Sequence, residues 1–107
     1  MFNIQAKTRI VEVADFSVAP DQHTAFGVAL TQAATTVLSQ AQGYQAHQIL
    51  ASHETPGRYV LLVDWDSVEA HTVGFRESAA FAEWRAIIGP FFAKPPYVEH
   101  FHVVASS

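Results

Sequence analysis

Three side chains with useful chemistry lie around one strand-to-helix junction near the middle of the chain: Trp65, His71 and Arg85. They supply an indole, an imidazole whose ordinary pKa is about 6.5, and a guanidinium that stays cationic at physiological pH. Elsewhere in the sequence, titratable groups and large aromatic rings are not gathered in this way. We therefore expect a catalytic site, if the protein has one, at this junction. The sequence leaves equally open whether His71 faces a cavity or solvent.

The remaining histidines are weaker candidates for chemistry. His100 and His102 form the best local pair for a metal ion, because residues two apart in a strand point to the same side. No third ligand follows at a diagnostic spacing, and the sequence does not connect His47 or His53 to the pair. We favour structural or exposed roles for His100 and His102 over metal ligation and expect no bound metal. His23 is predicted to lie on the solvent side of a helix.

The elements that must position these groups follow from the apolar periodicity and from the Gly and Pro signals. Asp66, with Glu69 three residues later, predicts the cap of the second helix directly after a strand. Pro95 and Pro96 end the following helical region. The predicted elements are a strand at 4–16, a helix at 20–43, strands at 44–53 and 58–65, a helix from 66 to 91 that bends near 74–78, and a strand at 97–105. This order predicts one α+β domain over residues 1–107, a ferredoxin-like βαββαβ fold with a four-stranded antiparallel sheet and both helices on one face.

Such a fold leaves one sheet face without helices, and here that face is predicted to be apolar. Half of the 107 residues are hydrophobic and only 15% are charged, which is more apolar surface than a small monomer buries easily. We assign Tyr59, Leu61 and Val63, or their neighbours in the strand, to the open face. Two such faces packed together predict a homodimer, a dimeric α/β barrel.

Composition excludes several classes of function. The chain has no cysteine, so it has no disulfide and no thiolate nucleophile or ligand. Its net charge is −4 with six scattered Lys and Arg, which argues against a nucleic acid partner. No apolar run is long enough to span a membrane and residues 1–7 lack the pattern of a secretory signal, so we expect a cytoplasmic protein without a membrane partner. Glycine-rich nucleotide loops are absent, and we expect no cofactor.

The sequence resembles the antibiotic biosynthesis monooxygenase family of dimeric α+β barrels. The resemblance rests on Leu-Val-Asp-Trp-Asp-Ser-Val-Glu-Ala-His at 62–71, on Ser-Ala-Ala-Phe at 78–81 and on Val-Glu-His-Phe at 98–101. The order of elements is similar over nearly the whole domain, and the sharp part is 59–101.

The resemblance implies a possible activity, oxygenation of polycyclic phenols to quinones without metal or flavin. In that activity an Asn, a Trp, a Tyr and an Arg surround the substrate. Trp65 and Arg85 match the Trp and the Arg, whereas His71 stands at the Tyr position and Leu61 at the Asn position. A related branch degrades haem with a helical histidine, but the corresponding position falls near Arg85, and Asn3 lies too early to match that branch's asparagine. Haem is therefore not expected.

Two functions remain open. In the first, the protein is a cofactor-free monooxygenase of an apolar or aromatic small molecule, an electron-rich phenol or hydroquinone. His71 removes a proton, Arg85 stabilises the anion, Trp65 forms the aromatic wall, and the rate rises with pH as the imidazole titrates. In the second, the protein is a non-catalytic dimeric barrel that binds a small ligand or serves in a stress response.

The residues predicted to contact the bound substrate are Leu61, Phe75, Phe81 and Trp84.

Overall fold

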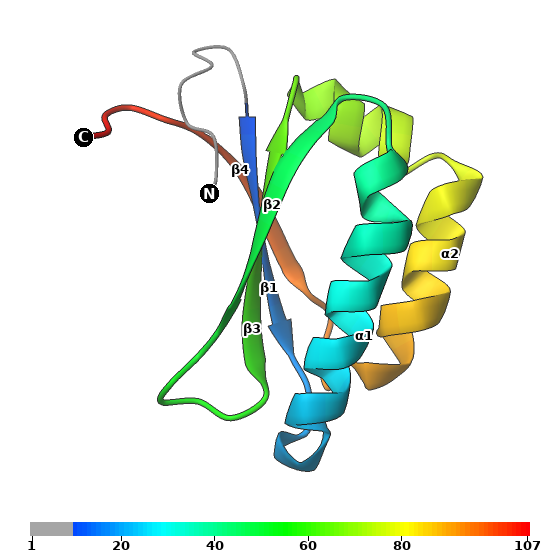
Figure 1. Ribbon diagram of the computed structural model, residues 1–107, viewed down its shortest axis with the longest axis vertical. Helices are drawn as coiled ribbons and strands as arrows, with labels where there is room; N and C mark the ends of the chain where they lie inside the picture. Colours follow the sequence, from blue (N-terminus) through cyan, green and yellow to red (C-terminus); the bar gives the residue numbers. More distant parts are fainter. Residues whose placement is uncertain (1–9) are drawn as a thin grey trace.

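The structure is a computed structural model that describes residues 10–107. Its elements are β1 (Ile10–Ser17), η1 (Pro20–Gln22), α1 (His23–Thr36), η2 (Leu38–Gln40), β2 (Tyr44–Ala51), β3 (Arg58–Trp65), η3 (Ala70–Phe75), α2 (Ala79–Ile88), η4 (Gly89–Phe91) and β4 (Tyr97–His102). All strand pairs are antiparallel, in the order β2-β3-β1-β4, and α1 and α2 lie side by side on one face of the sheet (Figure 1). The predicted ferredoxin-like α+β fold is confirmed, and the sheet of a single chain is open. The first part of the predicted strand at 4–16, and Asn3, lie outside the described residues.

The two faces of the sheet differ in burial because side chains alternate along each strand. On β3, Tyr59, Leu61 and Val63 are buried beneath the helices, so their assignment to the open face was wrong. Their neighbours Val60 and Leu62 occupy the open face instead, each only partly buried. Because this strand is apolar on both sides, the sequence does not indicate which side the helices cover.

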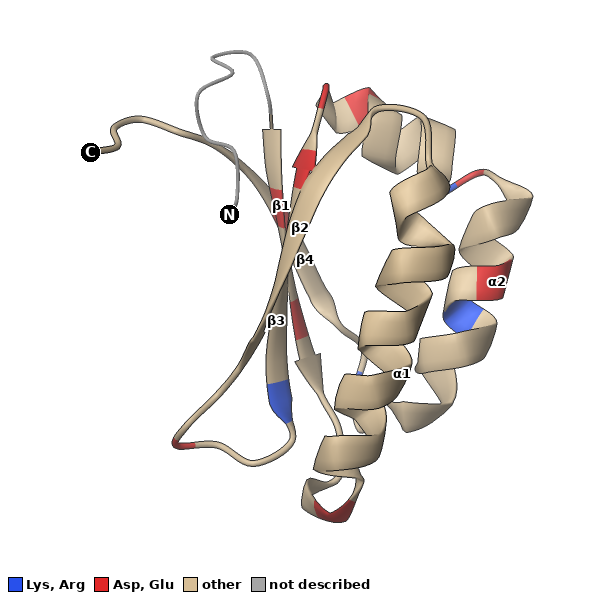
Figure 2. Ribbon diagram, in the orientation of Figure 1, with Lys and Arg blue, Asp and Glu red and all other residues tan. Residues whose placement is uncertain are grey.

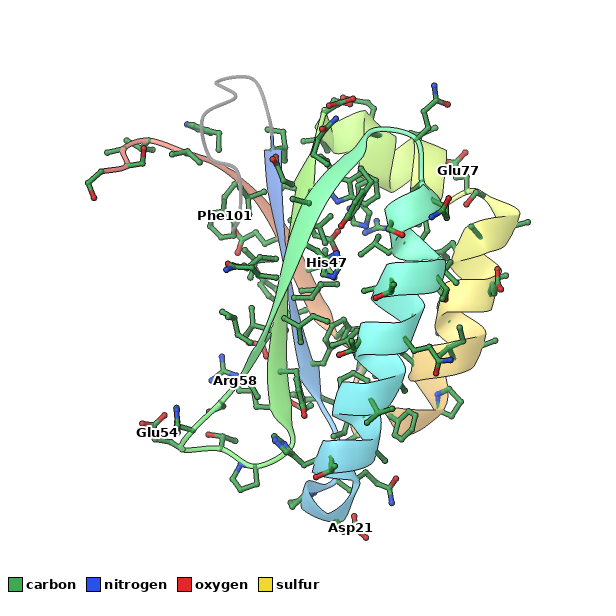
Figure 3. The ribbon with its side chains drawn as sticks, in the orientation of Figure 1. Asp21, His47, Glu54, Arg58, Glu77 and Phe101 are labelled. Atoms are coloured by element: carbon green, nitrogen blue, oxygen red, sulfur yellow. The ribbon has the colours of Figure 1, made fainter. Side chains whose placement is uncertain are left out.

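The core lies between the sheet and the helices. Phe26, Leu30, Ala33 and Ala34 form the buried stripe of α1, at the spacing expected for one helix face. Figure 3 shows His47 of β2 on this side of the sheet and Phe101 of β4 on the opposite side. No helix in the part of the chain that the structure describes is long and apolar enough to cross a membrane.

His23 corrects a second expectation, because it is not simply a surface residue. It is partly buried, and its Nδ1 accepts the backbone N–H of Gly57 at 2.7 Å. Gly57 lies in the turn between β2 and β3 with φ +86°, a conformation that suits glycine. The hydroxyl of Tyr59 donates to the backbone carbonyl of His23 at 2.9 Å. These two bonds attach the start of α1 to the hairpin.

The helical region after β3 also begins differently from the prediction. Ser67, not Asp66, caps it: Ser67 Oγ accepts the backbone N–H of Ala70 at 3.1 Å, and Asp66 accepts the side-chain amide of Gln45 at 2.6 Å. The first segment, η3, is a π-helix, separated from α2 by a turn. The bend predicted near 74–78 thus corresponds to the change from π-helix to α-helix.

Candidate functional site

The site begins with a carboxylate on the covered face of the sheet. Glu12 is in the middle of β1, where the alternation turns it toward the helices, and only 6% of its surface is exposed. In the strand register it faces His100 of the neighbouring β4. A buried carboxylate needs hydrogen-bond partners, and Glu12 has one from β3.

That partner is Trp65, the last residue of β3. The ring is fully buried, and its Nε1–H donates to Oε1 of Glu12 at 2.9 Å. The bond satisfies the single polar group of the indole and one oxygen of the carboxylate. It joins residues 53 positions apart in the chain.

His71 completes the cluster from η3. Its ring stacks on Trp65, with centroids 5.2 Å apart and planes inclined by 21°. Nε2 of His71 lies 3.4 Å from Oε1 of Glu12, and Nδ1 lies 2.8 Å from Nε2 of His100. One proton placement serves these contacts: His100 Nε2–H donates to His71 Nδ1, and His71 Nε2–H points toward Glu12. Hereafter Glu12, His71 and His100 are called the buried cluster.

The π-helix adds a cation to this cluster. In η3 the backbone N–H of Arg76 donates to the carbonyl of His71 at 2.9 Å, an i to i+5 bond. The wider turn therefore brings Arg76 one turn beyond His71, and the charge of Arg76 acts on the pKa of all three members of the buried cluster. π-helical turns are rare and often occur at functional sites.

Burial moves the titration of the cluster in opposite directions for acid and base. It raises the pKa of the Glu12 carboxyl from its usual 4.5 to about 7, although the Trp65 hydrogen bond and the Arg76 charge act to lower it. Burial lowers the pKa of His71 from 6.5 to about 4, and the charges of Arg76 and His100 act in the same direction. The pKa of His100 is lowered by burial and by Arg76. Near pH 7, both imidazoles are neutral and Glu12 is the group that changes charge.

The buried cluster opens on a cavity of about 550 Å³ between the sheet and α2. Its volume is in the range of pockets that hold small organic molecules. Glu12 and His71 contribute the polar groups of the sheet and η3, and most other lining side chains are apolar. The lining comprises Glu12, Ala14, Phe16, Leu38, Leu61, His71, Phe75, Arg76, Phe81, Trp84, Arg85, Gly89, Phe92, Ala93, Lys94, Pro95, Pro96 and Val98.

The structure places most of the candidate residues from the sequence at this cavity. His71, Arg85 and all four predicted contact residues line it, the latter being Leu61, Phe75, Phe81 and Trp84. Trp65 does not: it lies behind His71 and Glu12, without exposed surface. His102 is exposed, and His100 contacts His71 rather than pairing with His102. Within residues 10–107, no three His, Asp or Glu side chains converge as metal ligands do.

Sequence reasoning missed Glu12, the link to His100, and Arg76. Glu12 carried a signal, because it is a carboxylate directly between two β-branched apolar residues, Val11 and Val13, in a predicted strand. A charged residue in such a strand is buried only when it is paired or functional. Arg76 carried no such signal. A π-helical turn positions it, and the α-helical spacing used to predict the helix does not reveal that turn.

The comparisons with known proteins agree with this architecture. The sequence model of the family described as antibiotic biosynthesis monooxygenase matches residues 9–87. A Bordetella bronchiseptica protein with the same family name, solved by crystallography, is 39% identical, with a TM-score of 0.85 over 92% of this chain and 99% of that one. The uncharacterized Bacillus subtilis protein YczJ is 39% identical over 71 residues, 66% of this chain and 75% of that protein.

A more distant neighbour shares the fold. SnoaB from Streptomyces nogalater, described as a cofactor-independent oxygenase, is 16% identical, with a TM-score of 0.75 over 92% of this chain and 96% of that one. The family match covers most of the chain and includes β1, β3, η3 and most of α2, which together carry Glu12, Trp65, His71 and Arg85. The chain belongs to the antibiotic biosynthesis monooxygenase family.

Proposed function

We propose that the protein is a cofactor-independent monooxygenase that oxidises an electron-rich aromatic compound, a polycyclic phenol or hydroquinone. The observation that carries this proposal is the buried cluster: a carboxyl with a pKa raised to about 7, in contact with a neutral imidazole, at the end of an apolar cavity. A proton acceptor that titrates near the working pH is what general-base catalysis requires.

The first step is removal of the substrate's hydroxyl proton. The ionised form of Glu12, with His71 beside it, accepts this proton, and His100 holds His71 in the tautomer that allows it. Here the structure changes the expected pH dependence: because the pKa of His71 is lowered to about 4, the titration that limits the rate is that of Glu12, near 7.

The second step is reaction of the phenolate with dioxygen, which balances without a further reductant. The phenolate gives electrons to O2, a carbon–oxygen bond forms at the ring, and the ring carbon then loses its hydrogen as the O–O bond breaks. One oxygen atom stays in the quinone. The other takes up the proton held by Glu12 and the proton lost from the ring carbon and leaves as water, so that phenol plus O2 becomes quinone plus water and Glu12 is ionised again. Arg76 and Arg85, both at the cavity, stabilise the negative charge during this sequence.

The comparison with SnoaB supports the reaction class, since that protein of the same fold is described as a cofactor-independent oxygenase. The residues around the cavity support the substrate class. Phe75, Phe81 and Trp84 provide the apolar and edge-to-face surfaces that aromatic rings prefer.

The test is oxygen uptake with labelled dioxygen. The purified protein is incubated under 18O2 with a panel of polycyclic phenols and hydroquinones that each carry a hydrogen on the ring carbon to be oxygenated, in the presence of a metal chelator. We expect one labelled atom in the quinone and one in water. Glu12→Gln and His71→Ala should each lower the rate by about a hundredfold, the usual range for loss of a positioned base.

Glu54→Gln is the matched control, because Glu54 lies exposed in the loop between β2 and β3, remote from the cavity (Figure 3). Its rate should equal that of the parent protein. An unchanged rate for His71→Ala or Glu12→Gln would contradict the assignment of the buried cluster. Binding of these compounds without oxygen uptake would favour the ligand-binding alternative.

We also propose that two chains pair through their open sheet faces. That face carries Leu50, Tyr97 and Phe101, whose exposed fractions are 47%, 65% and 47%, together with the partly buried Val60 and Leu62. Exposed apolar side chains in one sheet face are typical of a protein interface. Such pairing would close two open sheets into the dimeric barrel that the sequence led us to expect.

A further inference from the structure

The cations of the described chain are concentrated at one cavity. Residues 10–107 contain four Lys and Arg, and three of them, Arg76, Arg85 and Lys94, line the cavity described above. The fourth cation, Arg58, is the first residue of β3. Figure 2 shows the blue segment of β3 away from the blue band on α2. The chain has a net charge of −4, so a cluster of three cations around one opening is unusual. An anionic ligand would explain why they are gathered there.

Arg76 acts on the buried Glu12 carboxyl at a distance, but within residues 10–107 none of the three cations is paired with a carboxylate. Among the described residues, no ion pair involves Arg76, Arg85 or Lys94. The fourth cation, Arg58, forms a salt bridge with Asp15, to which it donates two hydrogen bonds of 2.7 and 3.1 Å. Asp15, the acid near the Lys94 segment, is thus already occupied. All three side chains belong to exposed residues, so they form the rim of the cavity above an apolar floor.

The three cations are spread along the cavity. Arg76 belongs to the end with the buried cluster, whose pKa values it influences. Lys94 belongs to the opposite end. Its neighbour Ala93 donates its backbone N–H to the carbonyl of Ser17 at 2.8 Å, and Ser17 is the last residue of β1. The lining residues of β1 run from Glu12 to Phe16, about 13 Å of extended chain at roughly 3.3 Å per residue. Arg85 lies on α2 between these ends.

From this arrangement we infer that the substrate is an aromatic acid, with a permanently ionised carboxylate at the end of its ring system opposite the reacting hydroxyl. The carboxylate lies at Lys94, and the hydroxyl lies at Glu12 and His71 at the other end of the cavity. The orientation of the hydroxyl rests on the proposed function. The carboxylate site does not, because it depends only on the cations at the rim of the cavity. An apolar body with one charged end matches an apolar cavity with a cationic rim.

The test compares a matched acid and amide in binding, without turnover. The probes are 6-hydroxy-2-naphthoic acid and its primary amide, which place the two polar groups at opposite ends of a naphthalene, and binding is measured anaerobically by calorimetry. We expect the acid to bind about tenfold more tightly than the amide, a difference that a charge-assisted hydrogen bond supports. High salt should weaken binding of the acid only.

Variants of Lys94 give the decisive comparison. Lys94→Gln should remove the preference for the acid and leave binding of the amide unchanged, while Lys94→Arg should retain the preference. Equal affinities for acid and amide, or no binding of the acid up to about 1 mM, would overturn the inference. A preference for the acid without oxygen uptake by any phenol would contradict the proposed function and leave the carboxylate site standing; oxygen uptake with equal affinities would do the reverse.

Discussion

The indole N–H of Trp65 donates to the Glu12 carboxylate at 2.9 Å in the interior of the molecule, where neither residue is accessible to more than a few per cent. Trp65 therefore does not form the cavity wall that the sequence suggested. In the proposed reaction it is a positioning residue, which would act on substrate through Glu12 and through the stacked ring of His71.

Trp65→Phe should shift the pH profile of the reaction. The Trp65 hydrogen bond lowers the pKa of Glu12, so its loss raises that pKa further above 7. Since the ionised carboxyl accepts the proton, the rise of the rate with pH should move to higher pH. The variant should also lose about 2 kcal/mol of stability, from lost packing and an unpaired buried oxygen. The measurement is oxygen uptake between pH 5.5 and about 9.

Trp84→Phe is the control for this variant. Trp84 is a buried lining residue whose ring packs on Phe75, without contact to Glu12. It should weaken substrate binding and leave the midpoint of the pH profile in place. A Trp65→Phe profile with the parent's midpoint would show that the indole does not tune Glu12.

The buried cluster should also leave a signature in stability against pH. Glu12 has a raised pKa in the folded state, so its contribution is full below 4.5 and is lost as pH rises through about 7. His71 has a lowered pKa, so its contribution is present above 6.5 and is lost as pH falls through about 4. Between pH 4.5 and 6.5 the two effects oppose each other, and the parent protein should show little slope from this pair.

Single substitutions separate the two effects. Glu12→Gln leaves His71 and His100, whose pKa values are both lowered, so the free energy of unfolding should fall as pH is lowered from 6.5 to 4. His71→Phe keeps a ring on Trp65 and removes the histidine whose pKa is lowered to about 4, so the effect of Glu12 should exceed that of His100 and this free energy should rise as pH is lowered from 7 to 4.5. Each titrating group contributes a slope of about 1.4 kcal/mol per pH unit at most. Urea unfolding across pH 4 to about 8 measures both, and parallel curves for the two variants would contradict the assigned titrations.

The fold was predictable because its signals are periodic. Helical spacing in α1, the apolar run of β3 and the prolines before β4 each indicated an element that the structure contains. The covered side of β3 was not predictable, because Tyr59 to Val63 is apolar on both sides and hydrophobicity cannot choose between them. The choice depends on long-range contacts such as that of the Tyr59 hydroxyl with His23.

The site was predictable in its local part only. His71, Phe81, Trp84 and Arg85 follow one another within one helical region, and the structure brings all of them to the cavity. The partners of His71 come from β1 and β4, and they meet it only through the register that pairs Glu12 with His100. Strand register between distant segments is a tertiary property that no local pattern in this chain encodes.

Arg76 and Arg85 should have separable effects on the reaction. The charge of Arg76 lowers the pKa of Glu12, whereas Arg85 is not among the causes of that pKa shift. Arg76→Ala should therefore lower the rate and move the rise of the pH profile to higher pH. Arg85→Ala should weaken binding and lower the rate without moving that midpoint. Steady-state kinetics from pH 5.5 to about 9 distinguish the two, and a displaced midpoint for Arg85→Ala would place Arg85, too, beside the buried cluster.

The association of two chains should depend on the open face of the sheet. Leu62 lies on that face of β3, where the register flanks it with Val13 of β1 and Gln48 of β2. Light scattering at micromolar concentration should give about twice the chain mass of 11.8 kDa for the parent protein. Leu62→Glu places a charge in the middle of the apolar contact, so it should give the mass of a single chain. Val28→Glu, at an exposed position of α1 on the other side of the molecule, should keep the parent's mass. A folded parent protein with the mass of one chain would contradict the proposed pairing, because its open face would then remain in water.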